Sequence, residues 1–274
     1  MLRFVTVSFM SLLLLAGCRP MSSQRAPASD TTAPGRDEVE ARPYEVDHLL
    51  IYVRPEAARP DSPERRRLES AGLRPLNQPA RHADVGTASL GYLFENAYLE
   101  LVWIEDENLA RSAAPDLIAR TIRAGTLWSP FGVGLRGTAG RATPPPFAAR
   151  RYHADWMKPG DSIWIAEDGA GGRGPKVFVV PPAMAMPSWI GSLRRKGFVN
   201  SLRLSGVRIE SPVSTAEVAR QVEACSGVTI SAAPESTMTL TIESGAIETA
   251  DLRPDLPLLL HRAAPGDSTT ALPR

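Results

Sequence analysis

The chain has 274 residues and a formal net charge of +1, from 31 Lys and Arg against 30 Asp and Glu. Its basic residues are spread along the chain, which argues against a nucleic-acid-binding surface, so no nucleic-acid partner is expected. The only two cysteines, Cys18 and Cys225, cannot supply a disulfide framework. The fold must therefore depend on its buried core.

The N-terminal residues form a secretory signal pattern. Met1-Leu-Arg supplies a basic start, residues 4–15 are an apolar run, and small residues lead to Cys18. The apolar run is too short to span a bilayer comfortably as a helix. We therefore predict a signal peptide over residues 1–17 that directs export.

The segment Leu15-Ala-Gly-Cys18 resembles the bacterial lipobox, in which cleavage before the cysteine leaves a terminal Cys that carries acyl chains such as palmitate. The resemblance implies a lipoprotein anchored in the cell envelope through Cys18, with the membrane as a partner. Arg19 follows, so the aspartate that retains lipoproteins at the inner membrane is missing, which favours the outer membrane, facing the periplasm. An ordinary signal peptide that ends in a chance cysteine is the alternative.

Residues 18–43 predict a disordered tether. They are rich in Ser, Ala, Pro, Thr and charge without an apolar period, so they cannot bury enough surface to offset the entropy of ordering. Residues 263–274 have the same character and predict a frayed tail. The remaining residues, 44–262, are long enough for one large domain or two small, closely packed ones.

Residues 44–110 predict a βαβββ module. The expected elements are a strand at 46–53, a helix at 63–72, a weak strand near Leu73, and strands at 87–94 and 97–104. Ser62 is the expected N-cap residue of the helix, and Gly72 is its expected end. Glu95-Asn96 joins the last two strands as a two-residue hairpin turn, in which Asn96 is able to adopt a positive φ.

Residues 111–197 are expected to connect this module to a second one. The expected elements are a helix near 115–124 and strands near 133–136, 162–166 and 177–180. Pro144-Pro-Pro146 indicates an extended, irregular stretch between them.

Residues 198–262 repeat the outline of the first module. The expected elements are a strand at 201–209, a helix at 214–225, and strands at 228–231, 237–242 and 256–261. Ser214, with Glu217 three residues later, is typical of a capped helix start. Cys225 lies on the apolar face of this helix, which favours a buried, inert thiol over a nucleophile.

Several residues suggest chemistry but fail on their context. The segment Gly169–Gly174 has dinucleotide-binding spacing, but a strand follows it where phosphate binding requires a helix N-terminus, so a flexible hairpin loop is expected. Ser89 lies in an approximate nucleophile elbow, but the strand continues past it. His153 and His261 have few candidate partners nearby and predict hydrogen-bonded structural roles.

His48 and Glu100 are polar residues inside otherwise apolar strands. His48 follows Asp47 at the start of a Leu, Ile, Tyr and Val run, and Glu100 lies within Tyr-Leu-Glu-Leu-Val-Trp. Because an unpartnered buried polar group costs free energy, these two side chains must either pair or face a lined cavity. We predict that both face one cavity, as candidate catalytic residues.

Six blocks carry a family pattern, in chain order: Asp47-His48, Arg81–Ser89, Asn96–Leu101, Phe131–Arg136, Leu204–Ile209 and Asp251–Leu258. In this order and spacing, the blocks resemble the glyoxalase-like domain of the vicinal oxygen chelate superfamily, over nearly the whole globular part. The stretch from His82 to Glu100 is the most specific portion. It makes His82 and Thr87 candidate ligand-binding residues.

The resemblance implies an α+β fold in which two βαβββ modules form a curved half-barrel around one cavity. In metal-using members, the first and last strands of each module each give one ligand to a divalent cation. His48 and Glu100 fall on these positions of the first module, and imidazole with carboxylate suits zinc, iron, manganese or nickel. The resemblance therefore implies His48 and Glu100 as metal ligands.

The expected second module departs from that pattern. Its first strand, Ser201–Ile209, contains no His, Glu or Gln, its last strand has leucines where a carboxylate would be needed, and Phe198 stands where a histidine is often found. Two protein ligands hold a catalytic metal poorly, because three are usual. His82 could complete the set only if its loop folds inward.

Two hypotheses about function follow. The first is a metal-assisted lyase, isomerase or dioxygenase of the vicinal oxygen chelate type that acts on a small oxygenated metabolite. The second is a non-catalytic lipoprotein that binds a small molecule and whose metal site has lapsed. The sequence identifies neither the substrate nor an oligomeric state.

Overall fold

The computed structural model describes residues 42–121, 127–140, 144–167, 171–214, 216–244 and 248–264. The signal peptide, Cys18, the tether up to residue 41, and the tail beyond residue 264 lie outside the described residues. Gly169 of the glycine-rich motif lies outside them too. No helix in the described part of the chain is long and apolar enough to cross a membrane.

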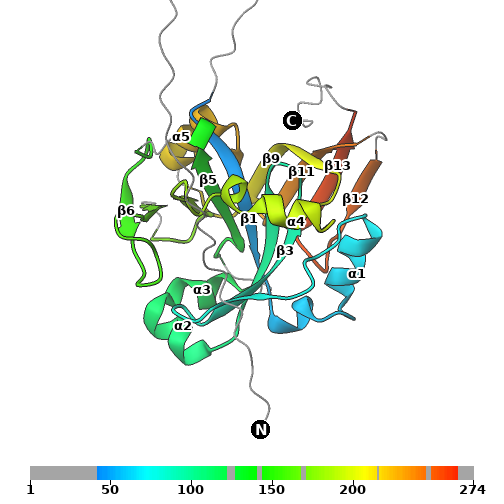
Figure 1. Cartoon of the computed structure of the whole chain (residues 1–274), viewed down its shortest axis with the longest axis horizontal. Helices are drawn as coiled ribbons and strands as arrows, with labels where there is room; N and C mark the ends of the chain where they lie inside the picture. Colours follow the sequence, from blue (N-terminus) through cyan, green and yellow to red (C-terminus); the bar gives the residue numbers. More distant parts are fainter. Residues whose placement is uncertain are drawn as a thin grey trace, which may run out of the picture. The chain divides into compact units, whose positions relative to one another are not determined.

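Eight strands form one mixed sheet in the order β2-β3-β4-β1-β5-β8-β7-β6 (Figure 1). Their bounds are β1 Tyr44–Tyr52, β2 Ala80–His82, β3 Thr87–Leu93, β4 Tyr98–Ile104, β5 Phe131–Gly137, β6 Ala149–Tyr152, β7 Ile163–Ala166 and β8 Lys176–Val179. β1 and β5 pair antiparallel at the centre, β1 is parallel to β4, and β5 is parallel to β8. The order β1-β4-β3-β2 therefore recurs as β5-β8-β7-β6.

Five strands form a second sheet in the order β10-β9-β11-β13-β12. Their bounds are β9 Arg203–Ser211, β10 Thr229–Ala232, β11 Thr237–Glu243, β12 Glu248–Asp251 and β13 Leu258–Ala263. The helices are η1 Pro55–Ala58, α1 Pro63–Ser70, α2 Glu107–Ala113, α3 Pro115–Arg120, η2 Thr138–Gly140, η3 Met186–Ser188, α4 Ile190–Arg195 and α5 Ala216–Ser226. This is an α+β protein with two sheets, as the sequence predicted at that level.

The expected partnership between residues 44–110 and 198–262 is wrong. The strands of residues 198–262 form the second sheet, where β9 is parallel to β10 and antiparallel to β11. Residues 111–197, expected as a connection, supply β5 to β8 beside β1. The four-strand unit was hidden because β6 reads Ala-Arg-Arg-Tyr, and its two central arginines, both exposed, give no apolar alternation.

Local signals placed the first helix correctly and the hairpin turn only in part. Ser62 accepts a hydrogen bond from the backbone N–H of Arg65 at 3.1 Å, and Gly72 after the helix has φ +79°. Asn96 does not adopt a positive φ, and its side-chain amide bonds to another strand. It donates to the carbonyl of Leu204 at 2.8 Å and accepts from the Leu204 N–H at 2.9 Å, which ties the hairpin to β9.

Some elements were not visible in the sequence. Near Leu73, where a weak strand was expected, the chain forms only an isolated antiparallel bridge between Pro75 and Tyr92, and β2 lies further on, at 80–82. The helices α2 and α4 and the strands β6 and β12 were not predicted. All four are short, so the tertiary contacts that stabilise them outweigh local propensity.

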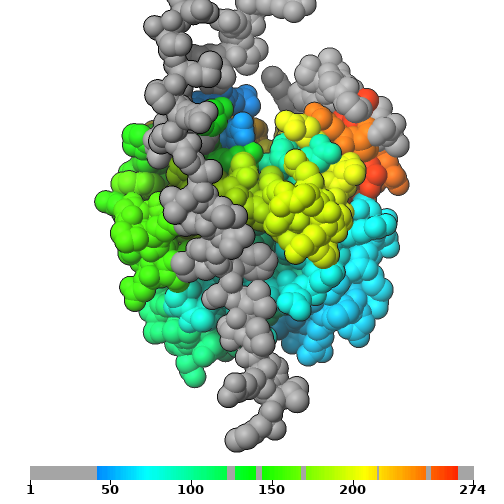
Figure 2. Space-filling model, in the orientation of Figure 1, coloured from blue at the N-terminus to red at the C-terminus, as the bar shows by residue number. Residues whose placement is uncertain are grey.

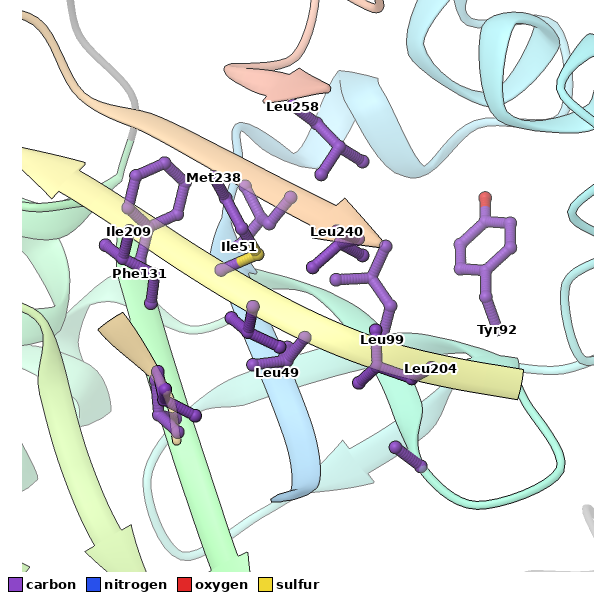
Figure 3. Close-up of a cluster of buried hydrophobic side chains, with 14 of the residues drawn as sticks. Leu49, Ile51, Tyr92, Leu99, Phe131, Leu204, Ile209, Met238, Leu240 and Leu258 are labelled. Carbon is purple, nitrogen blue, oxygen red and sulfur yellow. The ribbon is translucent and has the colours of Figure 1, made fainter. Parts of the chain in front are cut away.

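The main hydrophobic core lies between the two sheets (Figure 3). Leu49 and Ile51 of β1 are fully buried, and they belong to one cluster with Ile209, Met238 and Leu240 of the second sheet. Each such side chain contributes about 1.5–3 kcal/mol through burial. From His48 onward, the odd-numbered residues Leu49 and Ile51 therefore point toward the second sheet, and the even-numbered residues of β1 point to the opposite face.

That opposite face is concave. In a flat sheet, seven strand spacings of about 4.8 Å would separate β2 from β6 by about 34 Å. Instead, Asp84, in the turn after β2, accepts a hydrogen bond from the Tyr152 hydroxyl of β6 at 2.6 Å and one from the Trp156 indole at 3.0 Å. The eight-stranded sheet must therefore curl until its two outer strands approach each other across this face, which we call the concave face.

Candidate functional site

His48 and Glu100 both lie on the concave face, on neighbouring strands. In the parallel pairing of β1 with β4, His48 is opposite Tyr98, and Leu50 is opposite Glu100. Leu50 belongs to the small apolar cluster on the concave face, whereas Leu49 belongs to the main core. Strand geometry places the Cα atoms of His48 and Glu100 about 8 Å apart. They share a face, as the predicted site requires.

Asp47 holds the imidazole of His48. Its Oδ2 lies 2.9 Å from Nδ1 of His48, although adjacent residues of a regular strand point to opposite faces. The contact is made where the pairing of β1 with β5 shifts register, between Val46 and His48. This irregularity is a β-bulge in which Asp47 is the extra residue, which re-aims its carboxylate.

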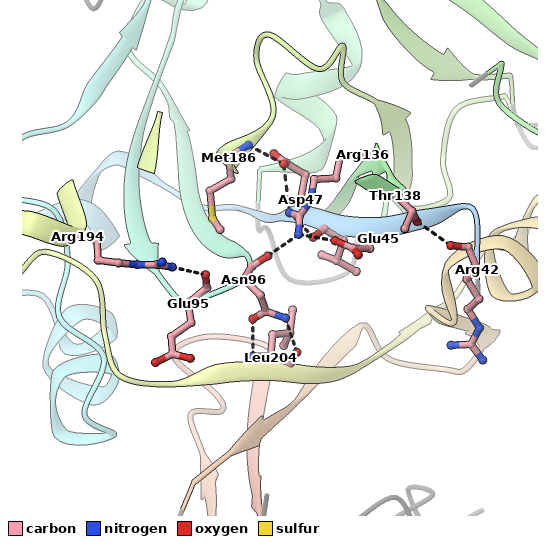
Figure 4. A network of polar contacts seen from close by, with 11 residues as sticks. Arg42, Glu45, Asp47, Glu95, Asn96, Arg136, Thr138, Met186, Arg194 and Leu204 are labelled. Carbon is pink, nitrogen blue, oxygen red and sulfur yellow. Dashed lines mark hydrogen bonds and ion pairs between the residues drawn. The ribbon is translucent and has the colours of Figure 1, made fainter. Parts of the chain in front are cut away.

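Asp47 is itself fixed from the other side (Figure 4). It is fully buried, and its Oδ1 accepts the backbone N–H of Met186 at 2.8 Å and lies 3.4 Å from Nη1 of Arg136. Arg136 also donates to the carbonyl oxygens of Val46 and Asn96, both at 2.9 Å. A carboxylate oxygen can only accept in such a contact, so the proton is assigned to Nδ1 of His48, and this tautomer leaves Nε2 with its lone pair.

Aromatic rings and a glycine enclose the His48 ring. The Tyr98 ring stacks on it with centroids 4.6 Å apart, and the Phe178 ring meets it edge-on at 5.1 Å. On β5, Gly134 leaves the space that a side chain would take, since a Cβ built there would lie 2.7 Å from Cε1 of His48. His48 is 8% exposed, and Nε2 has no hydrogen-bond partner among the described residues.

Glu100 is partly exposed and has polar neighbours. Its Oε1 accepts a hydrogen bond from the Ser89 hydroxyl of β3 at 3.3 Å. Burial raises the pKa of Tyr98, and the carboxylates of Glu100 and Asp47 raise it further. Burial also raises the pKa of Tyr52; Arg120 opposes this shift, and the carboxylates of Asp116 and Glu100 add to it. Both phenols therefore stay protonated near Glu100.

His82 and Thr87 pair with each other rather than with His48. His82 Nδ1 lies 3.0 Å from the Thr87 hydroxyl, and the two residues are opposite each other on β2 and β3. On the same face of β3, Thr87 is two residues from Ser89, which donates to Glu100. Five polar residues, which we call the polar row, therefore share the concave face: His48, Glu100, Ser89, Thr87 and His82. The two candidate ligand-binding residues, His82 and Thr87, lie at its outer end.

The donor set does not fit a three-ligand metal centre. Within the described ranges there is no group of three or more His, Cys, Asp or Glu side chains that could hold a metal ion. Asp47 occupies Nδ1 of His48, and His82 pairs with Thr87 instead of turning toward Glu100. We therefore derive no chemistry through a metal held by His48, Glu100 and His82.

The remaining candidates have structural environments. His153 Nδ1 lies 2.8 Å from the carbonyl oxygen of Asp161, and His261 Nδ1 lies 3.1 Å from the Thr249 hydroxyl. Burial raises the pKa of the Cys225 thiol to about 11, so the thiolate that would act as nucleophile is scarce at neutral pH. All three environments agree with the sequence-based interpretation.

Sequence reasoning missed three residues that build the site. These are Asp47, which orients His48, Arg136, which anchors Asp47, and Trp189, whose ring meets Tyr98 edge-on at 5.3 Å. Trp189 immediately precedes α4, which Figure 2 shows in yellow at the surface. An arginine inside an apolar strand was a usable signal for Arg136, whereas nothing local connects Trp189 to β4.

No protein-family model matches the chain, and no curated protein matches it. Among solved structures, it is similar to a hypothetical protein from Staphylococcus aureus, at 10% identity and a TM-score of 0.48, covering 81% of this chain and 99% of that one. It is also similar to a mutant of 4-hydroxymandelate synthase from Streptomyces coelicolor, at 12% identity and a TM-score of 0.36, covering 82% and 64%. These likenesses are too distant to assign a family. The fold and the site therefore define the protein only as an α+β protein that carries a row of polar residues on the concave face of its larger sheet.

Proposed function

We propose that this protein binds a small oxygenated metabolite on the concave face and that His48 and Glu100 transfer protons to and from it. The observation that carries the proposal is the pairing of a fully buried Asp47 with His48, on the same face as a partly exposed Glu100. A buried carboxylate that fixes one ring nitrogen and leaves the other basic is the arrangement used for general acid–base catalysis.

The chain's own groups suggest how the chemistry would run. Nε2 of His48 would accept a proton from a hydroxyl group or from a carbon next to a carbonyl, and Asp47 would stabilise the imidazolium that forms. The protonated phenol of Tyr98 would donate a hydrogen bond to a substrate oxygen. Glu100 would move a proton between two neighbouring substrate oxygens, and the His48 imidazolium would return its proton to the substrate, so that no net proton is gained or lost. The proposed class is therefore proton transfer on a substrate that carries neighbouring oxygens.

We propose further that the fold is of the vicinal oxygen chelate type, with the two halves of the eight-stranded sheet forming its half-barrel. The recurring order β1-β4-β3-β2 and β5-β8-β7-β6 supports this, as do the sequence blocks around His48 and Glu100. In this proposal the second half is residues 131–179 rather than 198–262. That half lacks a His, Glu or Gln on its β5 strand, Phe131–Gly137.

A ligand screen tests the binding. The purified domain would be tested by thermal shift against 2-oxo acids, 2-hydroxy acids and vicinal diols, since a ligand at about a hundred times its Kd adds roughly 2.7 kcal/mol of stability. His48→Ala and Glu100→Gln should remove the shift. His261→Gln and Glu105→Gln, histidine and carboxylate variants away from the polar row, should keep it. Equal shifts in all four variants would contradict the proposed site.

Asp47→Asn separates catalysis from binding. The amide oxygen of Asn remains the acceptor of the Met186 N–H, so the NH2 group faces Nδ1 of His48, favours the other imidazole tautomer and cannot stabilise the imidazolium. Turnover of any bound ligand should therefore fall by about 10²–10⁴-fold. Ligand affinity, measured by calorimetry, should change much less. If turnover is unchanged while affinity falls, the Asp47–His48 pair is not an acid–base device.

A second candidate function is binding without catalysis. The observation that favours it is the close packing of His48 between Tyr98, Phe178 and Gly134, which leaves its side chain 10% exposed. This candidate predicts ligands that stabilise the protein but are recovered chemically unchanged after prolonged incubation. Mass spectrometry of the recovered ligand decides between the two functions.

We also propose that Cys18 carries a lipid that anchors the protein in the cell envelope, at the outer membrane and facing the periplasm. The lipobox-like Leu15-Ala-Gly-Cys18 supports this. In a bacterial host, the wild-type chain should incorporate labelled palmitate and fractionate with outer membranes. Cys18→Ser should do neither, and an unlabelled wild-type chain would contradict the proposal.

A further inference from the structure

A cavity of about 340 Å³ lies away from the polar row, at the ends of β7 and β8. Its walls come from α3, β6, β7, β8, β10, the start of α5 and the loop before β8, and none of its lining residues is His48, Glu100, Ser89, Thr87 or His82. Part of the wall is apolar, formed by Ile165, Val177, Val218 and Ile230. Its size lies within the range of small-molecule sites in proteins.

The charged part of the wall carries a net charge of +1. Lys176, Arg150 and Arg120 supply three positive charges, and Asp116 and Glu167 supply two negative ones. The sum, 3 − 2, leaves one positive charge without a counter-charge among these lining residues. The cavity is therefore suited to a monoanion, because a dianion would leave one negative charge uncompensated.

Arg120 builds the wall and is not available to a ligand. Its Nη1 donates to the carbonyl oxygens of Ser129 at 3.0 Å and Gly174 at 2.7 Å, its Nη2 donates to that of Gly172, and its Nε donates to Asp116 at 3.2 Å. The three bonds to carbonyl oxygens fasten α3 to Ser129, just before β5, and to the loop at Gly172 and Gly174 that frames the cavity. Arg120 therefore contributes its charge and the shape of the cavity.

Lys176 and Arg150 have donors to spare. The ammonium of Lys176 makes one ion pair, to Asp116 Oδ2 at 3.3 Å, and Asp116 is already shared with Arg120. An ammonium has three donors, so two remain. Arg150 is exposed, and its guanidinium has no ion pair or hydrogen bond within the described ranges. Burial lowers the pKa of Lys176, the charges of Arg120 and Arg150 lower it further, and Asp116 opposes them.

We infer that this cavity is a second ligand site, which binds a small carboxylate with a short apolar body. The carboxylate accepts hydrogen bonds from Lys176 and Arg150, and the apolar body lies against Ile165, Val177 and Val218. A bound anion supplies the counter-charge that the lining lacks, and it relieves the repulsion among the three cations. The site goes beyond the proposed function and does not depend on His48 or Glu100.

The test uses cyclohexanecarboxylate as probe, with cyclohexanecarboxamide as its neutral counterpart and inorganic phosphate as a charge without an apolar body. Binding is followed by amide NMR on the full domain, where Gly172 and Gly174 line the cavity and Gly134 reports on the polar row. Cyclohexanecarboxylate should shift the backbone amide signals of Gly172 and Gly174 and leave that of Gly134 unchanged. Cyclohexanecarboxamide and phosphate should each bind about ten-fold more weakly, because the carboxamide lacks the negative charge and phosphate lacks the apolar body.

Variants on one strand provide a matched pair. Arg150 and Arg151 are neighbours on β6, but Arg151 points away, over the Trp164 ring at 5.2 Å and toward the Ser162 hydroxyl at 3.1 Å. Arg150→Gln should weaken carboxylate binding several-fold and Lys176→Met about ten-fold, whereas Arg151→Gln should leave it unchanged. Asp116 keeps Arg120 as its partner in Lys176→Met, so that variant should fold.

Three outcomes would overturn the inference: equal binding of the carboxylate and its amide, tighter binding of phosphate, or unchanged affinity in both Arg150→Gln and Lys176→Met. Failure of this second site can be distinguished from failure of the function proposed for the concave face. His48→Ala should abolish ligand binding on the concave face and leave cyclohexanecarboxylate affinity at its wild-type value.

Discussion

Gly134 gives the sharpest test of the site's geometry. A Cβ added there would lie 2.7 Å from Cε1, 2.8 Å from Nδ1 and 3.0 Å from Nε2 of His48, all on one ring. The ring cannot move aside freely, because Tyr98 stacks on its face and Asp47 holds Nδ1 at 2.9 Å. Gly134→Ala must therefore displace the imidazole and break the Asp47 contact.

The expected magnitude follows from two opposing effects. Over-packing a well-packed site costs about 1–3 kcal/mol. Replacing glycine where the backbone is not left-handed returns about 0.4–1 kcal/mol, through the entropy of the unfolded chain. The free energy of unfolding should fall by about 1–2 kcal/mol, and Tm by a few degrees for a chain of this size.

The assay is urea unfolding in a double-mutant cycle with His48→Ala. In the His48→Ala background the ring is gone, so the added methyl should fit, and the coupling energy should be about 1–3 kcal/mol. Gly191→Ala is the control, since its built Cβ comes no closer than 3.8 Å to Arg195 on the exposed side of α4. If Gly134→Ala costs the same with and without His48, the described packing of the imidazole is wrong.

Three further predictions concern stability and reactivity. Arg136→Met leaves the buried Asp47 carboxylate without its cation and should lower the free energy of unfolding by about 3–5 kcal/mol in urea titrations. Burial raises the pKa of Asp84, but hydrogen bonds from Tyr152 and Trp156 outweigh this and hold it below its usual value. The contribution of Asp84 to stability is therefore full above about pH 5 and is lost as pH falls through the lowered pKa, a dependence that Asp84→Asn should remove from acid-unfolding curves. In a Cys18→Ser chain, Cys225, with its pKa raised to about 11, should resist iodoacetamide at pH 8 until the protein is unfolded; rapid labelling of the native protein would contradict its burial.

Much of the local structure could be predicted from the chain alone. The strand at β1, the helix capped by Ser62, and the hairpin of β3 and β4 follow from alternating apolar residues and from cap and turn chemistry, which act over a few residues. The shared face of His48 and Glu100 also follows from strand alternation, once β1 and β4 are known to pair in parallel. The family resemblance implied only that the first and last strands of the module each give a ligand, and the pairing itself comes from the structure.

The partner of the first half could not be predicted in this way. Residues 198–262 show the clearer strand and helix pattern, so they were the natural choice for a second module. The strands that actually continue the sheet beyond β1 are β5, β8, β7 and β6, and Arg150 and Arg151 give β6 no recognisable strand pattern. Strand pairing depends on which surfaces meet in the folded chain, and the propensities of the local residues do not specify those contacts.

By itself the sequence determined the α+β class, the positions of the longer strands and helices, and the polar residues embedded in β1 and β4. Only the tertiary structure decided what those polar residues touch. The bulge at Asp47 turns its carboxylate toward His48, Arg136 and the N–H of Met186 fix it from segments roughly 90 and 140 residues away, and Gly134 makes room for the ring. These contacts depend on the register between distant strands, which is set by packing the whole core, so no local stretch of sequence could specify them.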